Sequence, residues 1–543
     1  MGRQAILLLT TAMTAALLAG LMVSTPASAI ATPFTVNTTA DPATPTTAGC
    51  DAAECTLREA IEEANANNNA PMIDTITFNI SGNGPHTISP TSELPEITEP
   101  LIIDGYSQPG FSPNTLAVGN DAVLKIELSG TSMPSIPANS LVSGLRITAA
   151  NSTVKGLVIS NWDQENGVFL ESGATGNKLE GNFIGTDASG INPLGNLAGV
   201  VSNGDNTIGG TTAAARNIIS DNGAGVQIGS ANEGNKVQGN YIGTNKDGTS
   251  TPNNLGNNNG VVIIGSPNNT IGGTTATARN IISGNFVYGI RIFGDGATDT
   301  QVQGNYIGTD ASDTQPLGNG LVGVAIQQGA ANNTIGGTTA TAGNVISGNG
   351  ISGSNPSFNT LSGVEVQFAN SDLPNAATGN RILSNSIYDN ARLGIDLYYT
   401  NDSPGVTCND LAPPPDADDG PNHLQNFPEF TSAKLTTKRI GGHRRKVTLI
   451  KGTLNSEADK IYNVQFFGSP EADNPPNPPY TITGYEEGKT FLGQKSVKTD
   501  SSGDATFTFT TRKKVPKGQI VTATATNQTT GDTSEFSKAV VVN

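Results

Sequence analysis

Short segments in which apolar and polar residues alternate recur along the middle of the chain, and no apolar segment of helical length separates them. The phrase Asn-Thr-Ile-Gly-Gly-Thr-Thr begins at Asn206, Asn269 and Asn333, at intervals of 63 and 64 residues. A second phrase, Gly-Asn-(Phe/Tyr)-Ile-Gly-Thr, lies between these copies, at Gly239 and Gly304. Alternation with period two predicts strands, and self-similarity at a fixed interval predicts a repeat architecture. Each cassette therefore holds two rungs of a solenoid.

Each rung contains three such segments, as in Lys236-Val237, Asn240-Tyr241-Ile242 and the pattern Gly-(Val/Ile)-x-(Ile/Leu/Val) at Gly225. Glycine and asparagine occupy the corners between them. Three strands per turn predict a parallel β-helix. The rungs resemble the right-handed parallel β-helix repeats of secreted bacterial proteins and polysaccharide-active enzymes. The predicted fold is therefore all-β, a right-handed parallel β-helix with about ten rungs.

The third segment of each rung separates the interior from the outer face. Its first and third positions are apolar, as in Val226 and Ile228, and are expected to fill the bore. The middle position varies from rung to rung and is expected to face solvent or a ligand. Trp162, the only tryptophan, and two phenylalanines of this region are the side chains expected to stack on a sugar. The candidate ligand-binding face consists of Phe169, Gln227, Arg291, Phe293, Glu365 and Asp396.

Asparagine recurs at the second corner of the rung. Asparagine tolerates positive φ, and its side-chain amide bonds to the like residue one rung away, ~4.8 Å along the axis. We therefore predict a structural ladder rather than a ligand site at this corner. Its members are Asn182, Asn217, Asn240, Asn280, Asn305, Asn344 and Asn385.

Residues 1–29 are expected to be a secretory signal peptide. An apolar stretch runs from Ala5 to Val23, and Ala27-Ser28-Ala29 provides a small-residue cleavage site. No other segment approaches the roughly 18 apolar residues of a spanning helix. The sequence predicts export with cleavage near Ala29, a secreted or cell-surface location, and no membrane span in the mature protein.

The three cysteines fit an oxidising compartment. Cys50 and Cys55 are close enough in sequence to close a small disulfide loop, which leaves Cys408 unpaired. The alternative is two free thiols at the first two positions.

A short amphipathic helix is predicted directly after these cysteines. Thr56 and Glu59 form a capping box, and apolar residues such as Leu57 and Ile61 share one face. Such a helix would cover the open end of the solenoid. The heptapeptide Cys-Thr-Leu-Arg-Glu-Ala-Ile from Cys55 resembles the Cys-Ser-Leu-Arg-Glu-Ala motif of secreted β-helix proteins. This resemblance implies a fold and not an activity.

Changes of composition predict the domain boundaries. Residues 30–70 form the N-terminal cap, residues 71–400 the β-helix, and residues 401–430 a linker rich in Pro, Asp and Asn. Residues 431–543 alternate strand-like segments with turns and predict an immunoglobulin-like β-sandwich. This last domain holds 16 Lys/Arg and 10 Asp/Glu, whereas the rest of the chain holds 13 and 36. Because an acidic rod repels phosphate, the expected partner is an extracellular polysaccharide or other surface polymer and not nucleic acid.

The sequence favours a protein without catalytic activity. Pectin-hydrolysing β-helix enzymes carry Asp-Asp and Gly-His-Gly signatures, but this chain lacks Gly-His-Gly and its only Asp-Asp pair, Asp418-Asp419, lies in the linker. Its three histidines lie before or after the main repeats, so none on a repeated rung serves as acid or base. The alternative is a calcium-dependent polysaccharide lyase, with Glu365 and Asp396 on consecutive rungs as ligands and Arg291 as base.

Calcium is the one cofactor that the sequence suggests, and the linker offers a second place for it. Asp410, Asp416, Asp418 and Asp419 lie in an oxygen-rich segment that lacks the closing Glu of an EF-hand. The alternative is a polar linker whose Asp and Asn residues make turns. The leading hypothesis is an exported, non-catalytic β-helix protein for adhesion to, or recognition of, polymers such as carbohydrate.

Overall fold

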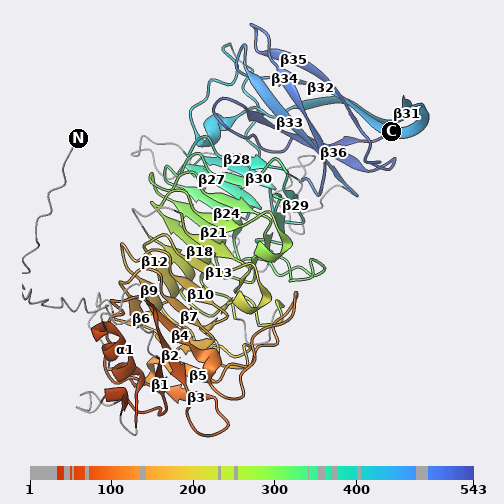
Figure 1. The fold of residues 1–543 in the computed structure, drawn as a ribbon. Helices are drawn as coiled ribbons and strands as arrows, with labels where there is room; N and C mark the ends of the chain where they lie inside the picture. The colour runs from red at the N-terminus through yellow and green to blue at the C-terminus, as the bar shows by residue number, and fades with distance from the viewer. Residues whose placement is uncertain are drawn as a thin grey trace, which may run out of the picture.

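The computed structural model describes residues 33–41, 49–51, 54–67, 72–134, 142–229, 234–249, 255–339, 341–351, 361–368, 377–399, 405–411, 413–471 and 487–543. The expected signal peptide lies outside these residues. Figure 1 shows a rod of stacked rungs with helix α1 at one end and a second domain at the other. None of the helices in the described part of the chain is long and apolar enough to span a membrane.

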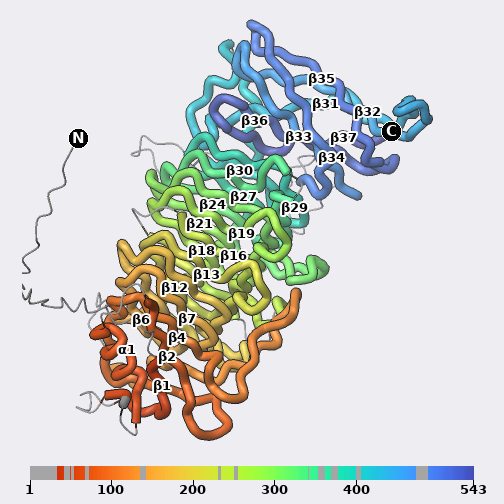
Figure 2. The backbone as a smooth tube through the Cα atoms, viewed as in Figure 1, coloured from red at the N-terminus to blue at the C-terminus, as the bar shows by residue number. Residues whose placement is uncertain are grey.

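Three parallel sheets run along the rod, and the tube in Figure 2 winds through them from red at the N-terminal end to blue-green at the last rung. The first sheet contains β1 (Pro33–Val36), β2 (Asp74–Phe78), β4 (Leu101–Asp104), β7 (Thr153–Lys155), β10 (Lys178–Glu180), β13 (Thr207–Gly209), β16 (Lys236–Gln238), β19 (Thr270–Gly272), β22 (Gln301–Gln303), β25 (Thr334–Gly336) and β28 (Arg381–Leu383). The second contains β3 (His86–Ile88), β5 (Ile126–Ser129), β8 (Leu157–Ser160), β11 (Phe183–Ile184), β14 (Ile218–Ile219), β17 (Tyr241–Ile242), β20 (Ile281–Ile282), β23 (Tyr306–Ile307), β26 (Val345–Ser347) and β29 (Ser386–Tyr388). The third contains β6 (Ser143–Ile147), β9 (Asn166–Leu170), β12 (Ala198–Ser202), β15 (Ala224–Ile228), β18 (Asn259–Ile264), β21 (Tyr288–Phe293), β24 (Val322–Gln327), β27 (Val364–Phe368) and β30 (Ile395–Tyr399). These sheets confirm the predicted parallel β-helix with three strands per rung.

The bore is filled by the apolar positions that the sequence pattern predicts. In the third sheet Val261, Ile290 and Val324 pair in register on successive strands, and all three side chains are fully buried. Burying each such side chain contributes about 1.5–3 kcal/mol to the free energy of folding, compared with leaving it exposed. Bore packing therefore fixes which face of each strand points inward, because a slip by one residue would invert every strand.

The N-terminal end of the bore is closed by helix α1 (Leu57–Ala66). The Thr56 hydroxyl accepts from the Glu59 N–H at 3.2 Å, and the Glu59 carboxylate accepts from the Thr56 N–H at 3.0 Å, which is the predicted capping box. The apolar face of the helix joins the buried cluster that runs through the bore. Cys50 and Cys55 form a disulfide nearby, while Cys408 is free and exposed.

The predicted asparagine ladder is present at the second corner of the rung. Each side-chain amide donates to the side-chain oxygen of the next member, as from Asn217 to Asn240 at 2.9 Å and from Asn344 to Asn385 at 2.9 Å. The same amides also donate to strand carbonyls, as from Asn240 to Ile208 at 2.8 Å. All seven predicted members are buried. The ladder therefore satisfies backbone groups at a corner that water does not reach.

The other two corners carry ladders that the sequence pattern did not predict. At the corner before the first sheet, ladder bonds join Asn177 to Asn206, Asn206 to Asn235, Asn235 to Asn269, and Asn333 to Asn380. At the corner before the third sheet, an unbroken ladder consists of Asn196, Asn222, Asn257, Asn285, Asn319, Asn349 and Asn390. All three corners of the rung are thus held by the same kind of bond.

Beyond the rod lies an antiparallel β-sandwich, as predicted. One sheet contains β31 (Glu429–Ile440), β32 (His443–Asn455) and β35 (Asp504–Thr511). The other contains β34 (Thr490–Lys498), β33 (Ile461–Ser469), β36 (Ile520–Asn527) and β37 (Val540–Val541). A separate buried cluster that includes Tyr462, Phe466 and Phe507 fills the space between the sheets. Single turns of 3-10 helix lie at Gly49–Asp51, Gly105–Ser107, Gly130–Ser132, Ala213–Ala215, Ala276–Ala278 and Pro421–Leu424.

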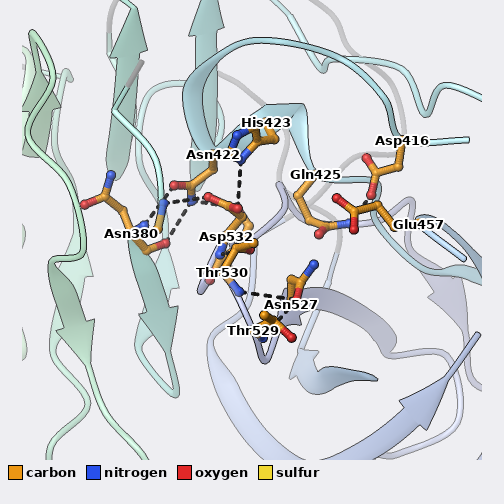
Figure 3. Close-up of polar contacts among 12 residues, drawn as sticks. Asn380, Asp416, Asn422, His423, Gln425, Glu457, Asn527, Thr529, Thr530 and Asp532 are labelled. Carbon is orange, nitrogen blue, oxygen red and sulfur yellow. Dashed lines mark hydrogen bonds and ion pairs between the residues drawn. The ribbon is translucent and has the colours of Figure 1, made fainter. Parts of the chain in front are cut away.

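The segment predicted as a linker and the sandwich together form the last layer of the rod. Asn422 continues the first ladder, because its side-chain oxygen accepts from the Asn380 N–H at 3.0 Å and its amide donates to the Asn380 carbonyl at 2.8 Å. His423 beside it pairs with Asp532 of the sandwich at 2.9 Å (Figure 3). Glu487 ends the third ladder by accepting from the Asn390 amide at 2.8 Å. The open C-terminal end of the β-helix is therefore closed by residues far away in sequence.

We expect Asn240→Ala to lower the free energy of unfolding by about 3 kcal/mol, because it removes the donor to the Ile208 carbonyl and the acceptor of the Asn217 backbone N–H inside the rod. Denaturant unfolding followed by circular dichroism measures this loss. The control Asn83→Ala lies at an exposed turn and should change stability by no more than about 0.5 kcal/mol. Equal effects of the two substitutions would contradict a stabilising ladder.

Candidate functional site

The outer face of the third sheet carries the predicted ligand-binding residues. Register pairs align the middle positions of successive strands, as in Val262 with Arg291 and Glu365 with Asp396. A column of glycines runs beside them along the sheet. A Cβ added to Gly289 would lie 2.6 Å from the Gly323 carbonyl oxygen, and Gly260 meets Gly289 at 2.5 Å in the same way. Only glycine therefore lets consecutive rungs approach closely enough to keep this face regular.

The part of this face nearer the N-terminus is apolar and largely closed. Phe169 belongs to a buried cluster with Val201, Val262 and two alanines of strands β12 and β15, and it is only 8% exposed. Gln227 lies half-buried among them. Trp162 is 1% exposed and belongs to the cluster of the bore. The expectation that Phe169 and Trp162 are exposed stacking platforms is therefore wrong, because packing between adjacent rungs buries both rings.

The central part of the face presents a cation held between aromatic rings. The Arg291 guanidinium lies 4.5 Å from the ring centre of Phe293 and 5.4 Å from that of Tyr288, all on strand β21. Its Nε donates to the Gln327 side-chain oxygen at 2.9 Å. All three β21 side chains are half-buried, and among the described residues Arg291 forms no ion pair. We call Tyr288, Arg291 and Phe293 the β21 patch.

The face changes character again towards the C-terminal domain. The Gln327 amide donates to Glu365 Oε1 at 3.2 Å, and Ser362 donates to Asp396 at 3.0 Å. Glu365 is fully buried and Asp396 is 5% exposed. Glu365 Oε2 has no hydrogen-bond partner. A chain of polar contacts thus leads from the half-buried Arg291 to a buried carboxyl group.

Burial raises the pKa of Glu365 to about 8, and the nearby Asp396 carboxylate adds to this rise. Burial also raises the pKa of Asp396 to about 6. Glu535 of the sandwich accepts from the Leu397 N–H at 3.0 Å. Burial and then the charge of Asp396 raise the pKa of Glu535 well above its usual value. All three carboxyl groups therefore favour their protonated form more than exposed carboxyl groups do, since burial and nearby like charges disfavour ionisation.

This burial corrects the expected accessibility of the acidic pair. Both the lyase alternative and the expectation of a ligand-binding face placed Glu365 and Asp396 on an open surface. The structure brings Arg291 and Glu365 together through Gln327, but it removes both carboxyl groups from solvent. On this face Arg291 is therefore accessible, whereas the two acids are not.

The acidic residues of the predicted linker have different surroundings. Asp416 is buried, and its oxygens accept from the Asn426 N–H at 2.9 Å and the Gln425 amide at 2.6 Å, with the Ser456 hydroxyl also in contact. Asp418 is half-buried and Asp419 is exposed, while the Asp410 N–H donates to Asn426 at 2.9 Å. Within the described ranges, no group of three or more His, Cys, Asp or Glu residues is arranged to hold a metal ion. Calcium binding stays a prediction.

Three residues of this site were missed by the sequence interpretation. Gln327 occupies the outward position two residues beyond Ala325, so the register of the strands offered a signal for it. Tyr288 precedes Arg291 by three positions, which alternation places on the opposite face, so the register offered no signal for it. Glu535 had no such signal, because its contact with Leu397 spans 138 residues.

We expect Glu365→Gln to raise the free energy of unfolding near pH 8 by about 1–3 kcal/mol, since the amide keeps the shape of the side chain and removes the buried charge. A carboxyl group with a raised pKa binds more protons in the folded state between its unfolded and folded values. Stability should therefore fall as pH rises from about 4.5 to about 8, and the variant should flatten this fall. Denaturant unfolding across that range tests this, with Asp205→Asn, at an exposed position, as control. An unaltered pH profile in Glu365→Gln would rule out the buried acid as its source.

No protein-family model matches this chain. No curated protein matches it at a significant level. Among solved structures, it is similar to the Dettilon tailspike protein gp208, with 15% identity and a TM-score of 0.37, over 84% of this chain and 89% of that one. It is also similar to the tailspike protein gp49 of Acinetobacter baumannii bacteriophage Fri1, described as a capsular polysaccharide depolymerase, with 9% identity and a TM-score of 0.21, over 88% of this chain and 80% of that one. At these values the β-helix assignment rests on the strand pairing of the chain itself.

Proposed function

We propose that this protein is an exported, non-catalytic recognition protein that binds a carbohydrate polymer along the outer face of the third sheet. The observation that carries the proposal is the β21 patch, in which one guanidinium is held between two aromatic rings on a flat, regular surface. Export is part of the proposal, and it is supported by the sequence of residues 1–29.

The chemistry of the β21 patch suits a sugar ring. Aromatic rings offer apolar faces for the C–H side of a pyranose, while the guanidinium offers a fixed fork of N–H donors for hydroxyl or ring oxygens. Within the described residues, Arg291 donates one side-chain hydrogen bond, from Nε to Gln327. Its two terminal nitrogens therefore remain available to donate to a ligand. Because both rings and Gln327 already hold the guanidinium, little conformational entropy is lost when a ligand binds.

The charge of the rod limits the kind of polymer. Outside residues 431–543 the chain holds 13 Lys/Arg and 36 Asp/Glu. A densely anionic polymer would be repelled along the length of such a rod, especially at low salt. The preferred ligand is therefore a neutral or sparsely charged polysaccharide. Arg291 can donate to the hydroxyl groups of such a polymer, and the acidic rod does not repel it.

The burial of the acidic pair supports recognition over catalysis. A lyase needs a base and a cation that reach the sugar, and a base must approach its proton to within hydrogen-bond distance. Glu365 and Asp396 do not reach the surface, and Glu365 is held neutral over much of the neutral pH range. Their contribution in this proposal is to support Gln327, which positions Arg291.

We expect Arg291→Ala to weaken binding to a neutral polysaccharide such as a glucan or mannan at least tenfold, or about 1.4 kcal/mol, as measured by affinity electrophoresis in polymer-containing gels. Arg291→Lys keeps the charge but loses the planar fork, so it should also weaken binding. The control Lys178→Ala removes an exposed cation from the first sheet and should bind as the native protein does. Undiminished binding by Arg291→Ala would remove the β21 patch from the proposal.

The same protein should release no unsaturated product from uronic-acid polymers in the presence of Ca²⁺, as followed by ultraviolet absorbance. Product that forms with the native chain and disappears in Arg291→Ala would replace the recognition function with a polysaccharide lyase. Product that persists in Arg291→Ala would locate catalysis elsewhere on the molecule.

A further inference from the structure

The hairpin formed by β31 and β32 extends beyond the third strand of its sheet. β35 pairs with β32 only from Thr448 to Asn455, whereas the pairing of β31 with β32 continues to Ile440 and His443. Residues 436–440 and 443–447 therefore form a two-stranded arm, which we call the β31–β32 arm. In Figure 1 this arm projects sideways from the sandwich, away from the rungs of the rod.

A tight turn fixes the register of the arm. Gly441 and Gly442 connect the two strands, and their φ values of 58° and 82° are both positive. A two-residue loop with two positive φ values matches the twist of a hairpin, and glycine adopts it without strain. A Cβ added to either glycine would meet no atom within 4 Å, so no described residue packs against this turn. The end of the arm is therefore open to a partner.

The register places like charges directly opposite one another. Arg439 pairs with Arg444. Lys438 pairs with Arg445 at the next position, and Lys446 follows. Side chains alternate between the two faces along a strand, so the two like-charge pairs lie on opposite faces of the arm. All five cations are exposed, and like charges directly opposite destabilise an antiparallel pair. The arm is thus cationic on both faces, at a cost to its own stability.

Acidic side chains do not offset this charge. The sequence contains no Asp or Glu from residue 430 to residue 456 or from residue 505 to residue 531. Within the described residues, none of the five cations forms an ion pair. Lys438 Nζ donates to the neutral Thr510 hydroxyl at 2.8 Å, and Arg439 Nε donates to the Gly442 carbonyl at 3.4 Å.

The cationic surface continues at the base of the arm. β35 ends at Thr511, which pairs with Thr448 beside the first residues of the arm. The next three residues of the chain, Arg512, Lys513 and Lys514, are exposed. The positive charge therefore extends from the end of the hairpin to the sheet.

Protection of strand edges does not account for a single sign of charge. Both strands of the arm lack a further neighbour, and charged side chains on such edges discourage pairing with another chain. A pattern with lysine opposite glutamate would protect the edges equally and would add a favourable cross-strand pair. The uniform positive charge instead fits a partner that is itself a polyanion.

The side chains of the arm select an acidic polysaccharide among polyanions. Three of the five cations are arginine, whose planar guanidinium meets a carboxylate with two parallel hydrogen bonds. Proteins bind single-stranded nucleic acid largely through aromatic platforms, and the sequence has no Phe, Tyr or Trp from residue 431 to residue 461. Attachment to a membrane surface combines cations with inserted apolar side chains, whereas this arm ends in two glycines.

We propose that the β31–β32 arm binds an acidic polysaccharide whose carboxylate groups pair with Lys438, Arg439, Arg444, Arg445 and Lys446. This site is separate from the β21 patch and does not depend on binding there. Residues 431–543 hold 16 Lys/Arg and 10 Asp/Glu, so the sandwich attracts a polymer that the acidic rod repels. At physiological ionic strength charges are screened within ~8 Å, so the rod acts weakly on an arm that projects away from it.

Binding of the full protein to immobilised polygalacturonate, measured by biolayer interferometry, is expected to saturate. The affinity should fall about tenfold or more between 50 and 200 mM NaCl, because pairing with the polymer releases counterions. The double substitution Arg439→Gln and Arg444→Gln should weaken binding at least tenfold. It also relieves the repulsion between the two side chains, so this variant should unfold at the same denaturant concentration as the native protein or a higher one.

The matched control is the double substitution Lys178→Gln and Lys236→Gln, which removes the same charge from exposed positions on the first sheet of the rod. It should bind polygalacturonate as the native protein does. Equal weakening by the two double variants would show that net charge alone determines binding, which would overturn the arm as the site. Arg291→Ala should leave this binding unchanged, so the result is independent of the β21 patch.

Two competing probes test the class of partner, namely vesicles of anionic phospholipid and a single-stranded DNA oligonucleotide. Arm-dependent binding to either probe that is tighter than binding to polygalacturonate would overturn the assignment to a polysaccharide. The absence of saturable binding to polygalacturonate at 50 mM NaCl would overturn it as well.

Discussion

The asparagine ladders are the interaction on which the rest of the structure depends. A β-helix turns its backbone three times in every rung, and each turn leaves N–H and C=O groups pointing along the rod where no strand pairs with them. A buried polar group without a partner costs about as much free energy as a lost hydrogen bond. Such groups occur at the corners of every rung, so the total cost would grow with the length of the rod. Asparagine solves this because one side chain carries a donor and an acceptor and tolerates the turn. Asn217 accepts from the rung before it and donates to the rung after it, so each ladder also sets the distance between rungs.

A ladder has ends, and the ends determine how the domains meet. Beyond the last members at two corners, Asn422 accepts from the Asn380 backbone N–H and Glu487 accepts from the Asn390 side-chain amide, where the next ladder asparagine would otherwise stand. Thr533 and Glu535 likewise accept from the N–H groups of Ile382 and Leu397 on the last strands. The linker segment and the sandwich thus continue the hydrogen-bond pattern of the rod, mostly with residues other than asparagine. This closure also protects the exposed strand edges of the final rung from pairing with another chain.

Several polar side-chain atoms are buried without a partner, both on the rod, as at His86, Thr300 and Glu365, and in the sandwich, as at Thr524. Glu365 Oε2, Trp162 Nε1 and Glu165 Oε2 are buried without partners on a rod whose corners are otherwise densely bonded. Local violations of such a pattern are expected at functional sites, since stability is lost there for a reason other than folding. One of them, Glu365 Oε2, belongs to the carboxyl group that accepts from Gln327, the residue that also holds Arg291 of the β21 patch.

The sequence by itself determined the architecture, because the physical causes are local and repeat. Period-two apolar positions give the bore, the column from Asn182 to Asn385 gives one ladder, and Thr56 with Glu59 gives the capping helix. Only the tertiary structure decided which outward residues are accessible. Phe169 is buried by side chains of neighbouring rungs. Asp396 lies near Glu535 of the sandwich, which accepts from the Leu397 N–H across 138 residues of sequence. Accessibility depends on what packs over a side chain, and no repeat in the sequence records a contact that is made only once.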